Sequence, residues 1–496
     1  MRLSELETSV AELFVERRGD VEIRDVSRDS RRVGPGDLFA ALPGERRDGA
    51  RFVSMARERG ASAVVVEAEH AEDLNLPALV VSDARKAMAH VAHAVHGQPT
   101  ETLGTIGVTG TNGKTTTTFL IEGVLRAAKK KTALLGTVTQ RILDDSRSTF
   151  FTTPESDDLA RFAREAADAG AERLVMEVSS HGLSLSRVLG VRFDIAAFTN
   201  LTQDHLDFHE SMEEYGETKA KLFTDFAPRV SIINIDDAFG ASLAERLSKL
   251  DKELVTVSAT GATGATIRAT NVRIDASGIR ATLSSPAGEH SLRSSLVGAH
   301  NLENLLITFA VALSCDVDAD VILAALAEGV STPGRLEEVA LSSDFRVLVD
   351  YAHTPDALRN VLAAVRTATT GRLIVVFGCG GDRDKEKRPL MGEAAALGAD
   401  LCIVTSDNPR TEDPALIVEA IVPGVESGGK RLNVDAFVNV DRRAAIAQAL
   451  GLAKPGDSIL IAGKGHEDYQ VIGTERFDFD DRTVAREAFT QLGGAL

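Results

Sequence analysis

The sequence predicts an α/β protein of three domains, and three observations lead to this fold class. The length of 496 residues suits about three domains of ordinary size. Between residues 101 and 333, apolar strand-like runs alternate with helical patterns, which is typical of a mostly parallel sheet with crossover helices. The alternation starts again after the helix-breaking run Thr332-Pro333-Gly334-Arg335. We therefore expect domains at residues 1–100, 101–333 and 334–496.

Composition and charge limit the classes of protein to which this chain can belong. Hydrophobic residues make up 44% and charged residues 26% of the chain, so each domain can bury its own core. The formal net charge of −18 argues against nonspecific binding to nucleic acid or to an anionic membrane. Cys315, Cys379 and Cys402 are far apart and lack metal-ligand spacing, which suits free thiols. With no apolar run long enough to span a bilayer and no signal-peptide core, we expect a cytoplasmic monomer that binds neither nucleic acid nor membrane.

The first 100 residues alternate short apolar runs with charged turns, as expected for a small α/β domain. Residues 64–66 and 79–81 are predicted strands, and Ala84–Val95 is a predicted helix. The polar segment Asp29–Phe39 leads into another strand and is either a ligand-binding loop or an ordinary surface turn. Gly97-Gln98-Pro99 interrupts the pattern and places the first boundary near residue 100.

The sequence TGTNGKTTT, between a predicted strand at 103–108 and a helical pattern that reaches Leu125, predicts an ATP site. A loop that opens a helix presents backbone N–H groups at the positive end of the helix dipole, where a polyphosphate binds. Lys114 is expected to reach the β- and γ-phosphates and Thr115 to offer its hydroxyl to Mg²⁺. Val108 stands where the strict pattern has glycine, so this is a variant phosphate loop. It comprises Gly110, Thr111, Asn112, Gly113, Lys114, Thr115 and Thr116.

Polar clusters follow several predicted strands, and ligands of parallel sheets gather at such strand ends. In the central region the clusters are Glu177–His181 and Thr199–His205. Residues 259–295, with alternating apolar positions, predict hairpins at the edge of this sheet. In the C-terminal region four strands run straight into charged loops, which we expect to form one functional rim: DYAHTPDA, GCGGDRDKEKRP, SDNPRTEDP and GKGHEDYQ.

These motifs resemble those of the Mur ligase family, ATP-dependent amide-forming enzymes of peptidoglycan synthesis. The resemblance covers essentially the whole chain and rests on ten motifs in family order: TGTNGKTTT, EVSSHGL, TNLTQDHLDFH, YGETKAKLF, GAHNLENLL, GRLE, DYAHTPDAL, GCGGDRD, DNPRTEDP and GKGHE. The family has three domains, which bind the UDP-sugar, ATP and the incoming amino acid. The resemblance thus implies a central P-loop domain and a C-terminal Rossmann-like domain.

The resemblance implies an ADP-forming ligase that joins a carboxylate to an amine. ATP would phosphorylate the D-Glu γ-carboxylate of UDP-N-acetylmuramoyl-L-Ala-D-Glu, and an amine of meso-2,6-diaminopimelate would displace phosphate from the acyl phosphate. Such chemistry needs positioning and charge neutralisation more than a nucleophilic side chain. The alternatives are L-lysine or D-Ala-D-Ala as acceptor, a folylpolyglutamate synthetase, against which DNPR and GKGHE argue, and a nucleotide-binding relative without turnover.

Several catalytic and metal-binding positions follow from the resemblance. Glu177 and His205, at the ends of strands predicted to be adjacent, match family positions for Mg²⁺, and a hard cation favours the carboxylate. Lys219 matches the family lysine that CO₂ carbamylates to support a second metal ion; the residues alone indicate only a lysine on a helix. His205 and His209 also resemble a helical zinc pair, but no third ligand follows at zinc spacing. The implied catalytic set is Lys114, Glu177, His205 and Lys219, and the metal set is Thr115, Glu177, His205 and Lys219.

The resemblance assigns further residues to the two nucleotides. Asn301 and Asn304 would share a helical face and read an adenine edge, although a cap and a surface amide are the alternative. Arg335 and Asp350 match family contacts to phosphate and to ribose or metal-bound groups, and His353 beside them has no assigned role. Hydroxyls and one arginine suit a diphosphate and an acylated sugar. The UDP-sugar-peptide set is Ser30, Thr152, Thr153, Ser179 and Arg187.

The remaining matches form the amino-acid site. Diaminopimelate carries a second amino-acid head that L-lysine lacks. Arg410 is expected to hold its carboxylate, and Asp407 and Glu467 its ammonium. Polar sites of this kind discriminate by roughly 10⁴–10⁵, and lysine-adding relatives typically lack the arginine, so we predict diaminopimelate. The set is Arg383, Asp407, Asn408, Pro409, Arg410, Gly463 and Glu467.

Overall fold

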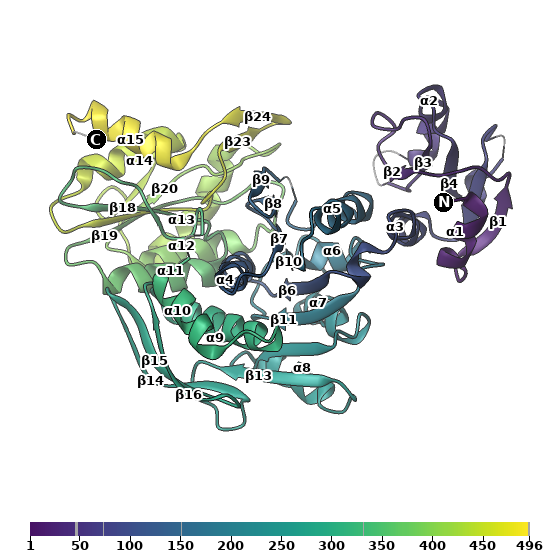
Figure 1. Ribbon diagram of the computed structural model, residues 1–496. Helices are drawn as coiled ribbons and strands as arrows, with labels where there is room; N and C mark the ends of the chain where they lie inside the picture. Colours follow the sequence, from purple (N-terminus) through teal and green to yellow (C-terminus); the bar gives the residue numbers. More distant parts are fainter. Residues whose placement is uncertain (45–47, 73, 150, 331, 495–496) are drawn as a thin grey trace.

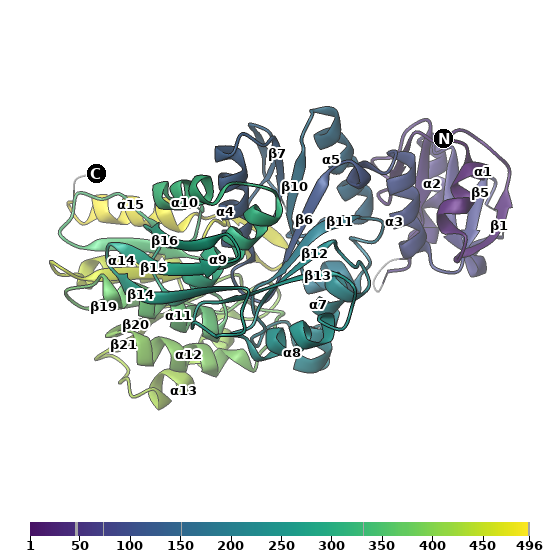
Figure 2. The same ribbon diagram turned by 60° about the horizontal axis from the view of Figure 1, so that its bottom comes forward.

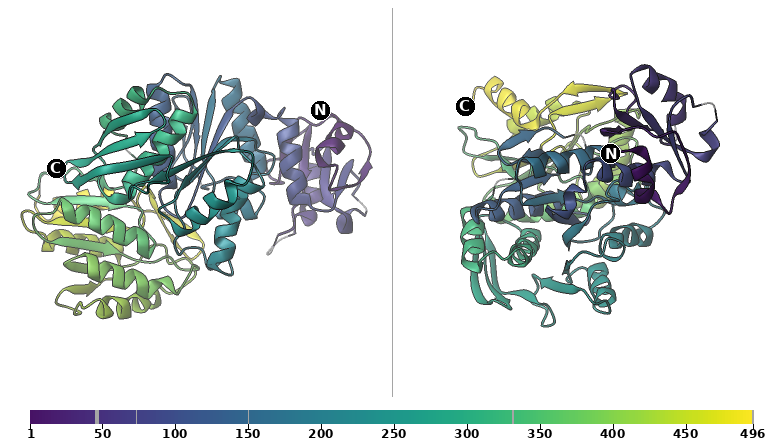
Figure 3. Two further views of the ribbon diagram at one scale, coloured as in Figure 1. Left: turned by 90° about the horizontal axis from the view of Figure 1, so that it is seen from below. Right: turned by 45° about the vertical axis from the view of Figure 1, so that its right-hand side comes forward.

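The computed structural model describes residues 1–44, 48–72, 74–149, 151–330 and 332–494. These residues form sheets of five, eleven and six strands, in that order along the chain, and a two-stranded hairpin. Figure 1 shows the five-stranded sheet at one end of the molecule and the six-stranded sheet at the other, and Figure 2 and the left view of Figure 3 show the same order. The predicted α/β class is confirmed, while the domain boundaries stay predictions.

The five-stranded sheet has the order β1-β5-β4-β3-β2, with β1 antiparallel to β5 and the other pairs parallel. Helix α3 coincides with the predicted helix and packs Met88 and Val91 into the core of this sheet. Asp83 caps the helix by accepting from the backbone N–H of Lys86. The elements are β1 (Phe14–Arg18), β2 (Asp25–Ser27), β3 (Asp37–Ala40), β4 (Ala63–Glu67), β5 (Ala78–Val81), α1 (Leu3–Leu6), α2 (Val53–Glu58) and α3 (Ala84–Val95).

The eleven-stranded sheet has the order β16-β15-β14-β13-β12-β11-β6-β10-β7-β8-β9. Strands β11 and β10 both run parallel to β6, so the loops after all three open at one edge. The predicted edge hairpins are confirmed as the antiparallel strands β14–β16. The strands are β6 (Gly104–Thr109), β7 (Thr132–Leu135), β8 (Gln140–Ile142), β9 (Asp145–Arg147), β10 (Arg173–Glu177), β11 (Phe193–Phe198), β12 (Val230–Asn234), β13 (Glu253–Ser258), β14 (Ile267–Asp275), β15 (Gly278–Ser285) and β16 (Gly288–Ser294).

Two hydrophobic cores sandwich this central sheet. One holds α4, α9 and α10, with Leu120 and Leu305 among its buried residues. The other holds α5 to α8, with Phe162 and Phe223. The helices are α4 (Lys114–Ala127), α5 (Ser156–Asp168), α6 (Ser180–Ser184), α7 (Met212–Thr224), α8 (Ala238–Leu247), α9 (Ala299–Ser314) and α10 (Ala319–Glu328).

The six-stranded sheet has the order β17-β18-β22-β19-β20-β21. Its four strands with polar ends, β18, β22, β19 and β20, are contiguous and parallel, which confirms the predicted rim. Its elements are β17 (Glu337–Glu338), β18 (Arg346–Asp350), β19 (Leu373–Phe377), β20 (Leu401–Val404), β21 (Ala436–Val438), β22 (Ser458–Ala462), α11 (Pro355–Thr367), α12 (Lys387–Gly398), α13 (Pro414–Ser427), α14 (Arg442–Leu452) and α15 (Asp481–Gln491). A hairpin, β23 (Tyr469–Ile472) with β24 (Glu475–Asp478), lies beside this rim.

None of the helices in the described ranges combines the length and the apolar composition that a membrane-spanning helix requires.

Candidate functional site

The phosphate loop joins β6 to α4 at the place that the sequence predicted. Two of its glycines are required by their surroundings. Gly110 has φ of 144° and a Cβ there would lie 1.9 Å from the hydroxyl oxygen of Thr199. Gly113 has φ of 87° and a Cβ would lie 2.5 Å from Asn304 Oδ1. The loop is therefore held against the loop after β11 on one side and against α9 on the other.

Two lysines, the half-buried Lys114 and the buried Lys219, converge on one carbonyl of this loop. Lys114 Nζ donates to the carbonyl oxygen of Gly110 at 2.9 Å, and Lys219 Nζ donates to the same oxygen at 2.9 Å. Lys219 is 1% exposed, on α7, and its ammonium lies 4.2 Å from the ring centre of Tyr215. Burial and the Lys114 cation lower the pKa of Lys219 well below its ordinary value. Among the described residues no carboxylate forms an ion pair with either lysine, and the charges of Asp204 and Glu177 offset part of their positive charge.

Glu177 ends β10 beside the first turn of α4. Its carboxylate accepts hydrogen bonds from the Thr115 hydroxyl at 3.0 Å and from the backbone N–H of Thr137 at 2.8 Å. Arg335, which lies just before β17, donates to the Thr115 hydroxyl at 3.1 Å. The structure therefore brings Lys114, Thr115, Glu177 and Arg335 together as the sequence predicted. Thr137, which follows β7, was missed, although it also lies at a strand end.

His205 lies in the loop after β11, and two expectations about it were wrong. The strands that precede Glu177 and His205 are not adjacent, because β6 lies between them. His205 and His209 are not a helical pair either, since His205 has φ of 56° and the fully described segment 199–211 contains no helix. His205 Nε2 lies 3.4 Å from Asp204 Oδ2, and burial lowers the pKa of this imidazole to about 3.

The central part of the predicted UDP-sugar-peptide set forms one cluster next to Glu177. Thr153 Oγ1 lies 3.1 Å from Ser179 Oγ, and Arg187 donates to the Thr153 carbonyl at 3.1 Å. Thr152 Oγ1 lies 2.9 Å from Thr137 Oγ1. A hydroxyl-rich wall with one guanidinium therefore extends from Glu177 toward the N-terminal sheet.

Ser30 lies apart from that cluster, in the N-terminal part, where its hydroxyl faces Met55 Sδ at 3.4 Å. Ion pairs nevertheless attach this part to the start of α5. Arg28 pairs with Asp157 and Asp158, and Arg85 pairs with Glu155 at 3.0 Å. Glu155 also pairs with Arg187 at 3.0 Å, which links the two halves of the predicted set.

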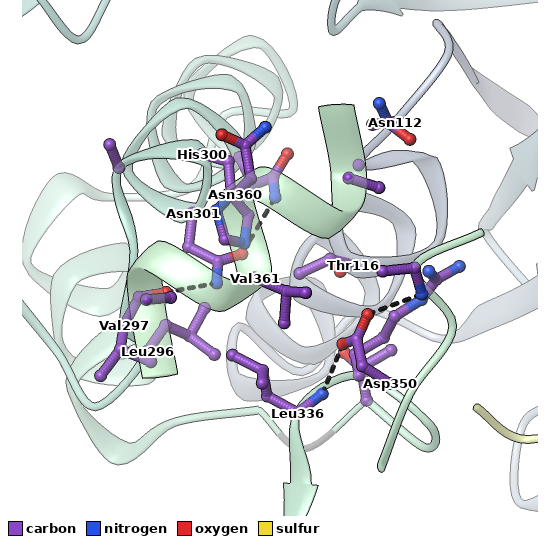
Figure 4. A pocket seen from close by; sticks show the side chains of 18 of the residues that line it. Asn112, Thr116, Leu296, Val297, His300, Asn301, Leu336, Asp350, Asn360 and Val361 are labelled. Atoms are coloured by element: carbon purple, nitrogen blue, oxygen red, sulfur yellow. Dashed lines mark hydrogen bonds between the residues drawn. The ribbon is translucent and has the colours of Figure 1, made fainter. Parts of the chain in front are cut away.

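A cavity of about 870 Å³ opens between the phosphate loop, α9 and α11. Figure 4 shows Asn112 and Thr116 on one side, with Leu296, Val297, His300 and Asn301 facing Val361 across the cavity. Its size is that of a small-molecule site, and its wall of apolar and amide groups suits a nucleobase. His300 and Glu303, which line the cavity beside Asn301, were not singled out from the sequence.

Most of the predicted residues around this cavity are hydrogen-bonded to other residues of the protein. Asn304 Nδ2 donates to Asn301 Oδ1 at 3.0 Å, which confirms that the two share one face of α9. Asp350 accepts from the backbone N–H groups of Leu336 at 2.7 Å and Ala352 at 2.8 Å. Burial raises the pKa of Asp350. Asp350 thus fixes the turn that presents Arg335 to the phosphate loop.

The predicted amino-acid residues gather on the rim of the six-stranded sheet. Arg410 donates to the carbonyl of Gly381 at 2.7 Å, and Arg383 lies beside the same glycine-rich turn. Burial and the nearby Arg383 cation lower the pKa of Arg410. Gly463 has φ of 115°, a backbone conformation that favours glycine, and a Cβ there would meet Asp407 Oδ2 at an ordinary contact distance of 3.5 Å.

Lys464 belongs to the GKGHE motif, but no role was predicted for it from the sequence. In the structure it lies among these rim residues. Lys464 is 0% exposed, and its ammonium pairs with Asp407 at 3.5 Å and with Glu467 at 3.3 Å. Burial opposes ionisation of Asp407, but Lys464 and Arg442 outweigh it and keep the pKa of Asp407 below its ordinary value. Burial and the Asp407 charge raise the pKa of Glu467.

The rim and the phosphate loop face each other across a polar contact. Asp204, 5% exposed, pairs with His353 and with Lys387, each at 3.7 Å. Asn112 of the phosphate loop donates to Asp356 at 3.1 Å. These contacts give His353 a place between the two sheets, which the sequence did not reveal because its partner lies in another part of the chain.

Among the described residues, no three His, Cys, Asp or Glu side chains gather as a metal centre. The oxygen donors at the phosphate loop nevertheless fit Mg²⁺, because that ion commonly takes one or two protein ligands and leaves the rest to water and phosphate. Thr115 and Glu177 meet this requirement, since their oxygens are 3.0 Å apart beside Lys114.

Comparisons with known proteins agree with this architecture. Residues 22–96 match the family model "Mur ligase family, catalytic domain", residues 108–312 match "Mur ligase middle domain", and residues 334–465 match "Mur ligase, glutamate ligase domain". A Geobacter sulfurreducens protein named UDP-N-acetylmuramoyl-L-alanyl-D-glutamate–2,6-diaminopimelate ligase is 46% identical, with 99% of each chain covered. A Streptomyces coelicolor protein of the same name is 44% identical, covering 96% of this chain and 94% of the relative.

The structure is also similar to that of a UDP-N-acetylmuramoyl-L-alanyl-D-glutamate–2,6-diaminopimelate ligase, with a TM-score of 0.67 and 35% identity. That match covers 95% of this chain and 96% of the other. Both the sequence and the fold therefore match over nearly the full length. The resemblance inferred from the ten motifs is confirmed, and the chain belongs to the Mur ligase family.

Proposed function

We propose that this protein is an ATP-dependent ligase that adds meso-2,6-diaminopimelate to the D-Glu γ-carboxylate of UDP-N-acetylmuramoyl-L-Ala-D-Glu. The relatives that match its full length carry this substrate pair in their names. The cavity beside the phosphate loop is the proposed ATP site. The charged residues on the rim opposite, around Asp407, Arg410 and Lys464, are the proposed amino-acid site, called the rim pocket. The hydroxyl-rich wall from Thr152 to Arg187 is proposed to hold the sugar-peptide between them.

The charge balance of the rim pocket carries the choice of amino acid. Its cations are Arg383, Arg410 and Lys464, and its carboxylates are Asp407 and Glu467. Lys464 pairs with both carboxylates. Burial and the Arg383 cation lower the pKa of Arg410 against the charges of Asp407, Glu467 and Asp382. A ligand carboxylate would relieve this repulsion with charge-assisted hydrogen bonds. Diaminopimelate supplies that carboxylate at its distal end, and L-lysine does not.

The proposed reaction uses positioning and charge neutralisation. Lys114, at the Gly110 carbonyl, and Arg335, at the Thr115 hydroxyl, would neutralise the phosphoryl group as it passes to the γ-carboxylate. Bound Mg²⁺, held by Thr115 and Glu177, would add Lewis-acid stabilisation of the phosphate charge. The contacts between the rim and the phosphate loop would bring the amine to the acyl phosphate, which it attacks as phosphate leaves.

Lys219 is the proposed carbamylated residue. Among the described residues it forms no ion pair with a carboxylate. Burial and the Lys114 cation lower its pKa against the opposing charge of Asp204, which favours the neutral amine that reacts with CO₂. The amine nitrogen forms a bond to the carbon of CO₂, one C–O π bond breaks, and the nitrogen loses a proton to solvent. The product places an anion next to Lys114. This anion would offset the charge of Lys114 and, with His205, support a second metal ion.

Product identification by mass spectrometry tests the proposal. Purified protein is given ATP, Mg²⁺ and UDP-N-acetylmuramoyl-L-Ala-D-Glu with equal meso-diaminopimelate and L-lysine. We expect the diaminopimelate adduct alone, with ADP formed only when both the nucleotide-linked dipeptide and the amine are present. A lysine adduct would keep the ligase and overturn the pocket assignment, and untouched ATP would favour a binding protein without turnover. Monomeric state and cytoplasmic location stay predictions.

A further inference from the structure

Strand β23 lies alongside the amino-acid loop 407–410 and contacts it residue by residue. The Gln470 side chain donates to the Asp407 carbonyl at 2.6 Å. The backbone N–H of Val471 donates to Asn408 Oδ1 at 2.9 Å. These contacts come from the segment that follows GKGHE, which the sequence did not connect with the DNPR motif.

The side-chain amide of Asn408 uses most of its hydrogen-bonding capacity within the protein. Its Oδ1 accepts from Lys464 Nζ at 3.0 Å as well as from Val471, and its Nδ2 donates to Glu467 Oε2 at 2.9 Å. A carbonyl oxygen has two lone pairs, so this one has no acceptor capacity left for a ligand. Asn408 therefore ties β23, Lys464 and Glu467 into one unit beneath the pocket.

Arg410 needs this support more than its neighbours do. Its φ of 52° places a residue other than glycine in the left-handed region, which is unfavourable for an L-residue. Both of its backbone groups are held by the hairpin: its N–H donates to the Val471 carbonyl at 3.0 Å, and its carbonyl accepts from Gly473 at 2.7 Å. Without these two bonds the backbone is free to relax, and the guanidinium would turn away from the pocket.

We propose that β23 is a template that holds loop 407–410 in its ligand-binding conformation, and that Gln470 is a positioning residue for selection of the amino acid. This inference rests on the proposed function, because it takes the rim pocket as the amino-acid site. Gln470 acts through Asp407 and, along the same strand, through Arg410. Its contribution is to the placement of these charges.

The test is Gln470→Met, which keeps the length of the side chain and removes its hydrogen-bond donor. The loss of one hydrogen bond predicts a rise of about two- to ten-fold in KM for the accepted amino acid. KM for ATP is expected to stay unchanged, and the preference for diaminopimelate over L-lysine to fall by a similar factor. Glu475→Gln is the matched control, because Glu475 is exposed on β24 of the same hairpin. Equal changes in both KM values, or unchanged discrimination, would overturn the template.

The wild-type assay separates this inference from the proposed function. A wild-type protein that accepts only L-lysine refutes the substrate assignment, and the template is then tested with KM for lysine. If Gln470→Met does not fold, hydrogen exchange on the wild type decides. The amides of Arg410, Val471 and Gly473 are expected to exchange at one common rate and to slow together when the amino acid binds. Independent exchange of these amides would contradict the template.

Discussion

Two fully buried lysines, Lys219 at the phosphate loop and Lys464 in the rim pocket, show how differently the two halves of the site treat charge. Lys464 is surrounded by Asp407, Glu467 and the Asn408 amide, so its cation is neutralised within the protein. Lys219 has a carbonyl and an aromatic face as partners, with a second cation, Lys114, on the same oxygen. The first lysine belongs to an ion-pair network, whereas the second forms no ion pair with a carboxylate among the described residues, and the charge of Asp204 opposes only part of its pKa shift.

The difference follows from what each half has to bind. A nucleotide brings several negative charges, so a positive site without counterions gains the most from binding it. A diamino acid is nearly neutral at each end, so its pocket has to hold fixed charges of both signs at defined places. Unpaired charge in one half and paired charge in the other are therefore matched to the two proposed ligands.

The largest expected effect is on the unpaired lysine. Lys219→Ala removes the group proposed to become anionic, and loss of such a charge at a phosphoryl-transfer site lowers kcat by about 10²–10³. A short carboxylic acid such as acetate is expected to restore part of the rate, since it can occupy the vacated space. Lys219→Arg, which keeps the cation and cannot form the carbamate, is expected to stay inactive with acetate. Absence of rescue in the alanine variant would count against a carbamate.

The paired lysine predicts a loss of stability instead. Lys464→Met leaves Asp407 and Glu467 buried without their cation, and breaking a buried pair in this way costs about 3–5 kcal/mol. Lys219→Met removes a buried amine that forms no ion pair with a carboxylate among the described residues, so its free energy of unfolding is expected to be unchanged or higher. Urea unfolding followed by circular dichroism compares them, because the chain has no tryptophan. Equal destabilisation by both variants would erase the distinction between the two lysines.

Arg410→Ala tests the rim pocket as a carboxylate site. The variant loses the guanidinium that is proposed to bind the distal carboxylate of diaminopimelate, and truncating one partner of a buried charged pair costs about 2–5 kcal/mol. KM for diaminopimelate is expected to rise by about 10²-fold, while KM for ATP changes little. Steady-state kinetics with each substrate varied in turn gives both values. A parallel rise in the two would show that Arg410 acts on the whole domain and not on the amino acid.

Local patterns in the sequence were sufficient for the elements and for much of the site. The phosphate loop, the four polar strand ends and helix Ala84–Val95 each depend on neighbouring residues, and each was found where predicted. The pairing of Asn301 with Asn304 is likewise a short-range property of one helix. Such features follow from glycine positions, apolar runs and helical spacing, which a single sequence contains.

Long-range arrangement could not be read in the same way. The sequence does not state that β6 separates β10 from β11, so the strands of Glu177 and His205 were wrongly expected to be adjacent. The bond from Lys219 to Gly110 joins residues 109 positions apart, and that from Gln470 to Asp407 spans 63. Charge pairing across such distances depends on the packed fold, and for that reason Lys464 had no role in the site that the sequence predicted.

The smallest expected effect concerns Glu303, which lines the nucleotide cavity between Asn301 and Asn304. Burial and the neighbouring carboxylates of Asp236, Asp237 and Asp356 raise its pKa from 4.5 to about 7. The folded protein therefore holds a proton that the unfolded chain releases, so stability falls as pH rises from about 4.5 to 7. Above pH 7 the ionised carboxylate also repels a bound nucleotide.

Affinity for ADP without Mg²⁺ is thus expected to weaken as pH rises from 6 to 8. In Glu303→Gln the added negative charge cannot form, so affinity at pH 8 is expected to be roughly five-fold higher than in the wild type, the equivalent of about 1 kcal/mol. Calorimetric titration at both pH values measures this, with Asp251→Asn, an exposed acid far along the chain, as the control. If both variants keep the wild-type pH dependence of ADP affinity, Glu303 does not cause that dependence. The charge that this half of the site presents to the nucleotide would then come from its lysines alone.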